Sequence, residues 1–233
     1  NPFPRMTSRY LAIDLGAESG RVMLGTLESG RISLKELSRF INKPIRDGDG
    51  MYWNIPALLD GIRDGLVSAG ALGQSISSVS ADAWGVDYVL IDNEGQIMEP
   101  VFHYRHPRTV DVEKKVLDKV DWPTLFDESG VQYMLLNTSI QLSSEDPKRL
   151  VMAKTILTIA DAFNYLLSGV AKIEVSMAST TQLYNPRLAR WSDRLIGALG
   201  FPKRIFPEVV SPATTLGPLK PDLLEDGGLT NIN

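Results

Sequence analysis

A short run of small and charged residues between two strand patterns limits most strongly what this chain can fold into. The run reads Asp14-Leu15-Gly16-Ala17-Glu18-Ser19-Gly20-Arg21. One strand pattern, over residues 10–14, ends at the start of this run, and a second, over residues 21–27, begins at its end. The chain must therefore reverse direction here in a tight turn. A Walker loop and a dinucleotide-binding fingerprint are excluded, because no Gly-Lys-Ser/Thr sequence follows and both motifs continue into a helix.

Two interpretations of this turn stay open on its residues alone. Glycines and a serine let backbone N–H groups approach an anion closely, Arg21 adds a positive charge, and Asp14 at the strand end is placed to hold a hydrated magnesium ion. Together these features predict a site that handles phosphate. An ordinary glycine-rich hairpin turn with a solvated arginine explains the same residues.

Three strand patterns in a row predict an antiparallel meander at the start of the chain. They cover residues 10–14, 21–27 and 32–40, and Glu28-Ser29-Gly30 forms the turn between the last two. A helix and a further strand follow. This order is typical of an α/β domain and is compatible with one half of a duplicated architecture, although the sequence contains no internal repeat.

That helix is expected from Asn54, whose side chain can cap it, to the breaks at Gly70 and Gly73. Its apolar positions follow the helical period; they are Leu58, Leu59, Ile62, Leu66 and Ala69. Strands are then expected over residues 76–82 and 88–91. The meander, the helix and these strands form the predicted sheet domain.

Helical patterns dominate the second half of the chain. One helix is predicted over residues 110–120, and a longer one from Pro147, capped by Asp146, to about Leu167. The side chains expected to face the core from the longer helix are Leu150, Ile156, Phe163 and Leu167. Proline and glycine are dense from Pro207 onwards, which predicts a connector and not an element that closes the fold.

Composition excludes several classes of protein and partner. Lysine and arginine total 24 against 28 aspartate and glutamate residues, a formal net charge of -4, which offers no basic field to nucleic acid or an anionic membrane. Without cysteine the chain has no disulfide framework, thiolate metal site or cysteine nucleophile. No apolar run reaches the ~18 residues of a membrane span, and we expect a cytoplasmic protein.

A second run, Asp82-Ala83-Trp84-Gly85-Val86-Asp87-Tyr88, lies at a predicted strand end, where the ligand clefts of α/β sheets open. Carboxylates accept hydrogen bonds from sugar hydroxyls, and an indole face packs on the apolar side of a sugar ring. The run therefore suits a sugar. The alternative is a buried tryptophan beside a turn capped by Asp87, and these residues alone favour that alternative.

Both histidines of the chain lie in the run His103-Tyr104-Arg105-His106. A metal site is disfavoured, because no cysteine completes it and Pro107 breaks any helix that would align the two rings. Tyr104 and Arg105 are better interpreted as polar groups that line a cleft. A Ser-His-Asp hydrolase is excluded because the chain has no Gly-x-Ser-x-Gly elbow.

Taken together, these runs resemble the FGGY carbohydrate kinase family over nearly all of residues 9–219. The segments that carry the resemblance are residues 13–21, residues 82–90, Tyr104-Arg105, residues 129–133 with Asn137-Thr138, and Ala178-Ser179-Thr180-Thr181-Gln182-Leu183. Several of them together are far more specific than any one. The resemblance implies an actin-like, ribonuclease-H-like α/β fold, in which a mixed sheet of an antiparallel meander and parallel strands is flanked by helices.

The resemblance also implies that this chain is the amino-terminal, sugar-binding half of an ATP-dependent ketose kinase. It implies transfer of phosphate from ATP to the 1-hydroxyl of L-rhamnulose, with Mg near Asp14, bound through water. The implied ATP contacts are Asp14, Gly16, Ala17, Glu18, Ser19, Gly20 and Arg21. The implied ketose contacts are Asp82, Trp84, Gly85, Asp87, Tyr104, Arg105 and Asn137.

The chain departs from the family pattern in two ways. Where the family generally has Tyr/Trp-x-Asp-x-Arg, this chain has Tyr104-Arg105-His106-Pro107-Arg108, with His106 in the aspartate position. The family's catalytic aspartate opens a second half, so we expect no catalytic residue in this chain and no activity from it alone. Residues 1–8 are expected to be a disordered or foreign lead, 9–219 the sugar-binding domain, and 220–233 the start of a connector to the missing carboxy-terminal half.

Other functions stay open. Another FGGY sugar kinase, acting on fuculose or xylulose, fits the same motifs, as does a non-catalytic sugar-binding or actin-like domain. A non-catalytic sensor would be expected to carry a damaged phosphate loop. The loop of this chain is intact at Asp14, Gly16, Ser19 and Arg21. An actin-like ATPase half would lack the sugar contacts at Trp84 and Asp87. Exposed surface between the two halves would favour self-association of the chain.

Overall fold

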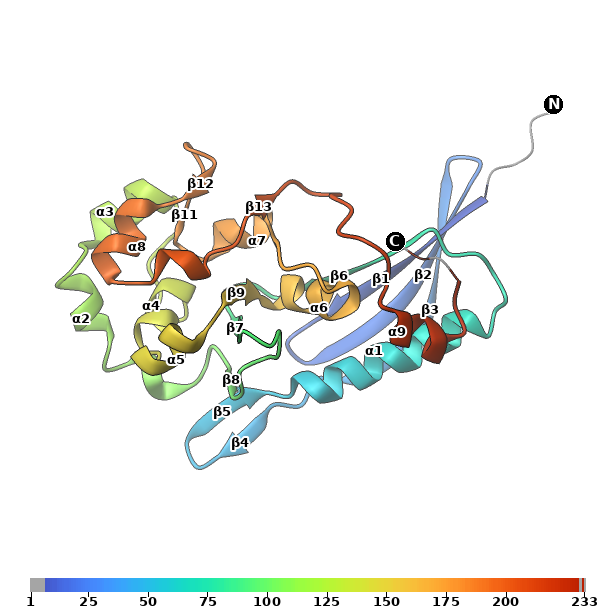
Figure 1. Cartoon of the computed structure of the whole chain (residues 1–233), viewed down its shortest axis with the longest axis horizontal. Helices are drawn as coiled ribbons and strands as arrows, with labels where there is room; N and C mark the ends of the chain where they lie inside the picture. The colour runs from blue at the N-terminus through green and yellow to red at the C-terminus, as the bar shows by residue number, and fades with distance from the viewer. Residues whose placement is uncertain (1–6, 231, 233) are drawn as a thin grey trace.

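The computed structural model describes residues 7–230 and 232, and Figure 1 shows the arrangement of its elements. The first half contains β1 (Thr7–Leu15), β2 (Ser19–Glu28), β3 (Arg31–Ile41), β4 (Ile45–Asp47), β5 (Gly50–Trp53), α1 (Ile55–Gly70), β6 (Ser78–Ala83), β7 (Tyr88–Ile91) and β8 (Val101–Phe102). The second half contains α2 (Glu113–Leu117), α3 (Trp122–Ser129), α4 (Thr138–Ser143), α5 (Pro147–Met152), β9 (Thr155–Thr158), α6 (Ile159–Ser168), β10 (Ile173–Glu174), α7 (Val175–Thr180), β11 (Tyr184–Asn185), β12 (Arg190–Trp191), α8 (Asp193–Leu199), β13 (Val209–Val210) and α9 (Pro221–Gly227). Long strands thus dominate the first half and short helices the second.

Four strands form the main sheet in the order β3, β2, β1, β6. β1 pairs antiparallel with β2, and β2 pairs antiparallel with β3, which confirms the predicted meander. β1 pairs parallel with β6, because the crossover through α1 returns the chain to the same end of the sheet. The sheet is therefore mixed, and the predicted α/β class is confirmed.

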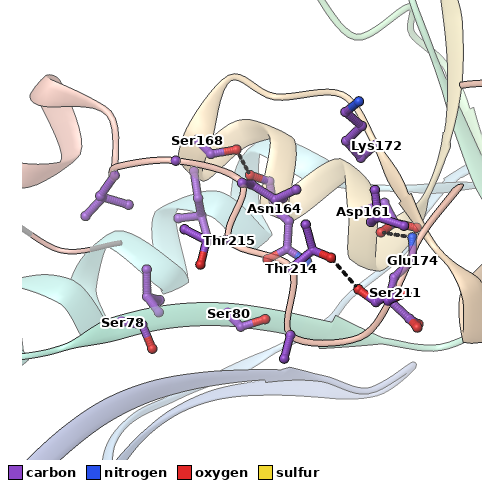
Figure 2. Close-up of a pocket in the computed structure, with 17 residues that line it drawn as sticks. Ser78, Ser80, Asp161, Asn164, Ser168, Lys172, Glu174, Ser211, Thr214 and Thr215 are labelled. Carbon is purple, nitrogen blue, oxygen red and sulfur yellow. Dashed lines mark hydrogen bonds between the residues drawn. The ribbon is translucent and has the colours of Figure 1, made fainter. Parts of the chain in front are cut away.

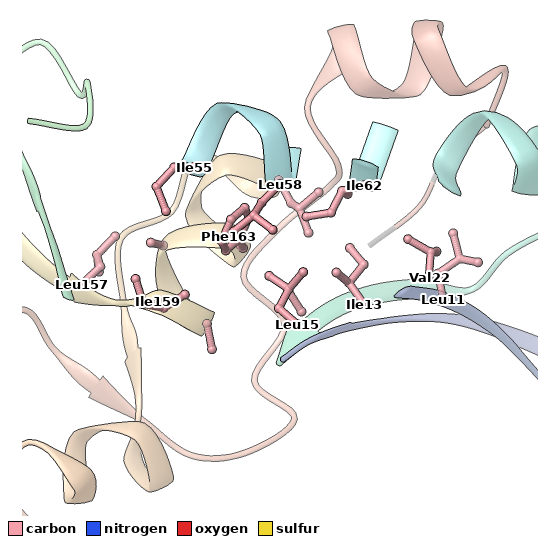
Figure 3. Close-up of a cluster of buried hydrophobic side chains, with 14 of the residues drawn as sticks. Leu11, Ile13, Leu15, Val22, Ile55, Leu58, Ile62, Leu157, Ile159 and Phe163 are labelled. Carbon is pink, nitrogen blue, oxygen red and sulfur yellow. The ribbon is translucent and has the colours of Figure 1, made fainter. Parts of the chain in front are cut away.

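Side chains alternate along β1 between a buried and an open face. Leu11, Ile13 and Leu15 are each at most 2% exposed, whereas the residues between them are exposed. The buried side chains pack against Leu58 of α1 and Phe163 of α6, so both helices lie on the same face of the sheet (Figure 3). The opposite face of the sheet keeps its charged and polar side chains accessible.

Phe40 of β3 fills the space between the sheet and α1, where two glycines make room for its ring. A Cβ added to Gly20 of β2 would lie 2.3 Å from the Phe40 ring, and one added to Gly61 of α1 would lie 2.4 Å from it. Real Cβ atoms do not approach other carbons so closely. The helix therefore lies close to the sheet because both positions lack a side chain.

A side chain takes the place of a further strand beside β6. Asn164 of α6 accepts a hydrogen bond from the Ala81 N–H at 2.9 Å and donates one to the Ala81 carbonyl at 2.9 Å. These two backbone groups point away from β1, where an edge strand would leave them without a protein partner. The amide of Asn164 therefore satisfies the outer edge of the sheet at this residue.

The second half packs around an apolar cluster of its own. Leu125, Ile140 and Leu183 are fully buried in it. β7 pairs antiparallel with β9 and lies between this cluster and the main core. Its Val89 belongs to the main core and its Leu90 to the second cluster. β7 therefore joins the sheet to the helical half.

The single helix predicted from Pro147 to about Leu167 is wrong. The structure has α5 over Pro147–Met152, strand β9 over Thr155–Thr158 and α6 over Ile159–Ser168. All residues of β9 are buried, and β-branched Thr and Ile side chains pack well on a strand that is covered on both faces. Pairing with β7 completes the strand. Within the helix predicted over 110–120, the α-helical residues are Glu113–Leu117.

The proline- and glycine-rich end contains an element of the fold, contrary to the prediction of a simple connector. Helix α9 packs beside α1, and its Leu223 and the following Leu229 are buried in the main core. Residues 220–233 as the start of a connector to another half stay a prediction. Of the predicted lead 1–8, residues 1–6 lie outside the described residues, while Thr7 and Ser8 belong to β1. Within residues 7–230 and 232, no helix has the length and apolar character that a membrane crossing requires.

Replacing Gly61 by alanine is expected to destabilise the domain. Alanine improves helix propensity by about 1 kcal/mol, but its Cβ would displace the Phe40 ring, and overpacking a core costs about 1–3 kcal/mol. Gly197 of α8 is the matched control, because a Cβ there meets no atom within 4 Å. Thermal unfolding followed by circular dichroism should show a lower melting temperature for Gly61→Ala and a higher one for Gly197→Ala. A rise for both variants would contradict the close packing at Phe40.

Candidate active site

A row of charged side chains crosses the open face of the main sheet at the end of β1. In the strand register Asp14 lies opposite Arg21 of β2 and beside Asp82 of β6. The Arg21 guanidinium donates to Asp14 Oδ2 from Nε at 2.7 Å, and its Nη2 lies 2.6 Å from the same oxygen. Asp14 and Asp82 are exposed. The row therefore offers carboxylate oxygens and a fixed guanidinium to a ligand above the sheet.

Asn42 holds the turn between β1 and β2 in shape. The Gly16 N–H donates to the Ser19 carbonyl at 2.8 Å, which closes the turn. Asn42 Nδ2 donates to the Gly16 carbonyl at 2.9 Å, and the Asn42 N–H donates to the Glu18 carbonyl at 3.0 Å. Because the turn is already ordered, a ligand that binds to it pays little conformational entropy.

Gly20, a predicted ATP contact, differs from the other residues of this run. It is buried in β2 beneath the Phe40 ring, so packing explains why a glycine stands there. Glu18 is exposed, and Gly16, Ala17 and Ser19 are half-buried. Packing therefore explains Gly20, and contact of ATP with the turn itself stays a prediction.

Aromatic rings from three segments stack beside the turn. The ring centroids of Trp84, which follows β6, and Trp53 of β5 are 4.1 Å apart. Trp53 also stacks on His103 at 4.0 Å, and His103 lies 4.4 Å from Tyr104. Trp53 and His103 are buried, whereas Trp84 and Tyr104 are half-buried and offer ring surface to a ligand. We call these four residues the aromatic platform.

Asp87 lies within the aromatic platform and is 0% exposed. Its Oδ2 accepts hydrogen bonds from Trp53 Nε1 at 2.6 Å, Trp84 Nε1 at 3.0 Å and the Tyr104 N–H at 3.3 Å. Its Oδ1 accepts one from Gln141 Nε2 at 2.8 Å. Burial raises the pKa of Asp87 to about 6, although these donors act to lower it. The predicted sugar contact through Asp87 is therefore not favoured by its position.

His103 is neutral at pH 7. Its Nδ1 accepts a hydrogen bond from the Arg105 N–H at 3.0 Å, which places the ring proton on Nε2. Burial lowers the pKa of His103 to about 4, with a further contribution from the positive charges of Arg105 and Arg46. The ring is therefore an uncharged member of the aromatic platform, and the structure gives it no partner for a metal site among the described residues.

A cavity of about 260 Å³ lies between the turn and two members of the aromatic platform, His103 and Tyr104, whereas Trp53 and Trp84 do not line it. Ala17 and Glu18 of the turn line it together with Tyr104 and Arg105, all of them predicted site residues. Its other lining residues are Ile41, Asn42, Lys43, Pro44, Met51 and His103. The buried Oδ1 of Asn42 has no hydrogen-bond partner among the described residues. Segments far apart in the sequence thus form one cavity, which combines apolar side chains with the charged Glu18, Lys43 and Arg105.

The loop from β6 to β7 has a strained backbone. Val86 has a φ of 69°, which is unfavourable for a β-branched residue. Its carbonyl accepts hydrogen bonds from Thr138 Oγ1 at 2.6 Å and Gln141 Nε2 at 3.3 Å. A Cβ on Gly85 would lie 3.3 Å from the Thr180 side chain, so α7 packs against the same loop. Three of the segments that carry the sequence resemblance therefore meet here.

Asn137, a predicted ketose contact, is fully buried at the start of α4. Its Nδ2 donates to the Gln132 carbonyl at 2.8 Å, and its Oδ1 has no partner among the described residues. It does not line the 260 Å³ cavity. The structure therefore places Asn137 next to Thr138, which bonds to the strained loop, and away from the cavity lining.

His106, which stands where the family pattern has an aspartate, caps the short 3₁₀ turn Pro107–Thr109. Its Nδ1 accepts a hydrogen bond from the Arg108 N–H at 3.1 Å. Burial and the charge of Arg108 lower the pKa of His106, so its ring keeps this acceptor at neutral pH. An aspartate would cap the turn through the same kind of bond. The departure from the pattern therefore preserves the local structure.

A second cavity, of about 300 Å³, lies between α6, β6 and residues 210–219 (Figure 2). Asp161 at its wall accepts hydrogen bonds from Thr158 Oγ1 at 2.5 Å and the Glu174 N–H at 3.0 Å. Burial raises the pKa of Asp161 to about 6. None of the predicted site residues, all of which are described, lines this cavity. It is therefore separate from the candidate active site.

Sequence analysis missed Asn42, Trp53 and Gln141. Asn42 acts on the turn from 26 positions away, and Gln141 reaches Asp87 across 54 positions, so no local pattern indicates either contact. Trp53 carried a partial signal, because a buried tryptophan usually finds a hydrogen-bond acceptor for its indole N–H.

Comparison with known proteins identifies the family. The model of the FGGY family of carbohydrate kinases, N-terminal domain, matches residues 9–232. Rhamnulokinase of Bacteroides thetaiotaomicron is 34% identical over 230 residues, which are 97% of this chain and 47% of that protein. Rhamnulokinase of Oceanobacillus iheyensis is 35% identical over 222 residues, which are 94% of this chain and 47% of that protein. The chain spans about half the length of the curated relatives it matches.

Solved structures of sugar kinases share the fold. Gluconate kinase from Lactobacillus acidophilus gives a TM-score of 0.84 at 13% identity over 97% of this chain and 47% of that chain. Xylulose kinase from Lactobacillus acidophilus gives 0.83 at 13% identity over the same shares. These structures confirm the fold alone, and the family rests on the matched domain model and the closer relatives. The chain belongs to the FGGY family of carbohydrate kinases, of which it carries the amino-terminal domain.

Proposed function

We propose that this chain is the sugar-binding half of an ATP-dependent kinase that phosphorylates the 1-hydroxyl of L-rhamnulose. The observation that carries the proposal is the 260 Å³ cavity between the turn after β1 and the aromatic platform. Phosphate transfer requires a phosphate-handling group and a sugar-binding surface held side by side. The name rhamnulokinase on both relatives supports L-rhamnulose as the ketose.

ATP and magnesium fit the charged row on the sheet. The exposed carboxylate of Asp14 supplies oxygen ligands of the kind that Mg²⁺ prefers, often through retained waters. Arg21 is held by Asp14 and can donate to phosphate oxygens beside the turn that the Gly16 N–H closes. Magnesium, when bound, neutralises the negative charge of the phosphates.

The ketose fits against the aromatic platform. Trp84 and Tyr104 offer half-buried ring faces to the apolar side of a sugar, and Arg105 and Asp82 offer hydrogen bonds to its hydroxyl groups. The glycine at position 85 lets Thr180 of α7 pack against the strained loop that follows Trp84. Proximity of this surface to the turn directs a sugar hydroxyl towards the phosphate.

The general base and the rest of the ATP site would come from the half of the relatives' length that this chain does not span. That carboxy-terminal half would also close the cleft and exclude water, which phosphate transfer to a sugar requires. The base alone contributes roughly 10²–10⁴-fold to the rate. We therefore infer that the chain binds ketose by itself, catalyses nothing by itself, and works in the cytoplasm with its other half.

Isothermal titration should detect L-rhamnulose binding to the chain, with weaker binding of L-fuculose and D-xylulose. A parallel assay with ATP, Mg²⁺ and L-rhamnulose should show no sugar phosphate, because the base is expected in the other half. Tighter binding of fuculose or xylulose would assign the chain to a different ketose kinase. Turnover by the purified chain would contradict the missing base.

Trp84→Ala should weaken ketose binding about tenfold, which corresponds to about 1.4 kcal/mol, because the sugar loses an aromatic face. Trp122 of α3 provides the matched control, since it is 39% exposed and its ring packs on Phe126 and not on the aromatic platform. Titration of both folded variants should show the loss for Trp84→Ala only. Unchanged affinity in Trp84→Ala would leave the tryptophan with a packing role.

Arg21→Ala in the full-length protein should lower turnover at least about 10²-fold and change ketose affinity little. The reason is that the variant removes a preorganised hydrogen-bond donor to the charge that develops on the phosphate during transfer. Arg39→Ala is the control, because Arg39 lies beside Arg21 in the same row but pairs with Glu36. Steady-state kinetics and ketose titration separate the two effects. Equal losses of turnover in both variants would indicate a general effect of charge on the sheet.

A further inference from the structure

We propose that Asp87 is the positioning residue of the ketose surface: its buried carboxylate holds Trp84 and Tyr104 in place and does not itself contact the sugar. The proposal rests on the proposed function for the identity of the ligand. It differs from the sequence-based expectation, in which Asp87 accepts a hydrogen bond from a sugar hydroxyl. The four hydrogen-bond donors to the Asp87 carboxylate and its burial favour the positioning role over direct contact with the sugar.

The donors come from four separate parts of the chain. Trp53 lies on β5, Trp84 follows β6, Tyr104 follows β8, and Gln141 lies on α4. The Asp87 carboxylate is the acceptor that these four segments share. One carboxylate thus fixes the relative positions of four elements, two of which present the partly exposed rings of the aromatic platform.

The protein supplies three donors to Asp87 Oδ2 and one to Oδ1. A carboxylate has about four lone-pair sites, and this one accepts hydrogen bonds from four protein donors at 2.6–3.3 Å. The side chain is also 0% exposed. Oδ1 accepts from Gln141 alone, but a sugar hydroxyl could reach its second lone pair only if the residues that bury Asp87 moved aside.

The chemistry of the site requires a group that only accepts. Both indole N–H groups and the Gln141 Nε2 point at the carboxylate. In an Asp87→Asn variant the amide oxygen can still accept from the two indoles. Its NH₂ group would then face the Gln141 amide nitrogen, donor against donor. Asp87→Asn therefore disturbs the platform with almost no change in side-chain volume.

Asp161 offers a matched control in the same chain. It is also a buried carboxylate, 5% exposed, and it also accepts from a side chain and a backbone N–H. Its partners, Thr158 and Glu174, are not aromatic, and it lines the other cavity (Figure 2). Asp161→Asn therefore reports the general effect of neutralising a buried carboxylate here.

The experiment compares near-UV circular dichroism and L-rhamnulose titration for the unmodified chain, Asp87→Asn and Asp161→Asn. Near-UV bands report the packing of the stacked Trp53 and Trp84 rings, which lie 4.1 Å apart, and need no ligand. We expect altered tryptophan bands and about tenfold weaker ketose binding for Asp87→Asn only. Trp53→Phe provides a second variant, because Trp53 is 1% exposed and donates to Asp87 at 2.6 Å. Trp53→Phe should also weaken ketose binding, because it removes a donor to Asp87 while leaving the partly exposed rings of Trp84 and Tyr104 in the chain.

Weaker binding by Asp87→Asn with unchanged tryptophan bands would overturn the proposal, because the carboxylate would then act on the sugar directly. Unchanged bands and unchanged affinity would overturn it too. If the unmodified chain binds no ketose, the proposed function fails, while altered bands in Asp87→Asn alone still support the positioning role. If Asp87→Asn does not fold, normal ketose affinity in Trp53→Phe overturns the proposal.

Discussion

The alternation of side chains along β1 is the constraint on which the rest of the structure depends. Leu11, Ile13 and Leu15 face the helices, and Asp14 faces the open side of the sheet. A shift of one residue in this strand would bury the charge and expose the apolar side chains. Because β1 pairs with β2 on one side and β6 on the other, the same register also sets the neighbours of Asp14. One strand therefore fixes both the core and the charged row.

The aromatic side of the site depends on buried polar contacts instead of strand register. Gln141 connects the strained loop to a deeper network, since its Oε1 accepts from Arg108 Nη2 at 3.4 Å. Arg108 pairs with the buried Glu145 at 3.2 Å, and Glu145 pairs with Arg149 at 2.8 Å. Buried charges of this kind stay favourable only when each has its partners. The ligand surface therefore rests on groups that cannot move independently, which keeps it preorganised.

Local patterns in the sequence predicted the parts of the fold that local forces decide. The meander, the helix after Asn54 and the turn after Asp14 all follow from strand and helix periods and from capping. The single helix predicted from Pro147 is wrong because β9, which lies within it, pairs with the distant β7. The apolar spacing of this segment suits a helix as well as a strand, so the local pattern does not indicate the pairing. The burial of Asp87 could not be predicted from local sequence patterns either. It depends on Trp53 and Gln141, which lie 34 and 54 positions away.

Asn164 has a consequence for how this domain behaves at high concentration. An open strand edge is a template on which other chains can add and start an aggregate. At Ala81 an incoming strand would find both backbone groups already bonded to an amide that is anchored on α6. It would have to break two hydrogen bonds and move a helix-borne side chain before gaining any of its own. One residue of a helix thus contributes to the solubility of the sheet beside it.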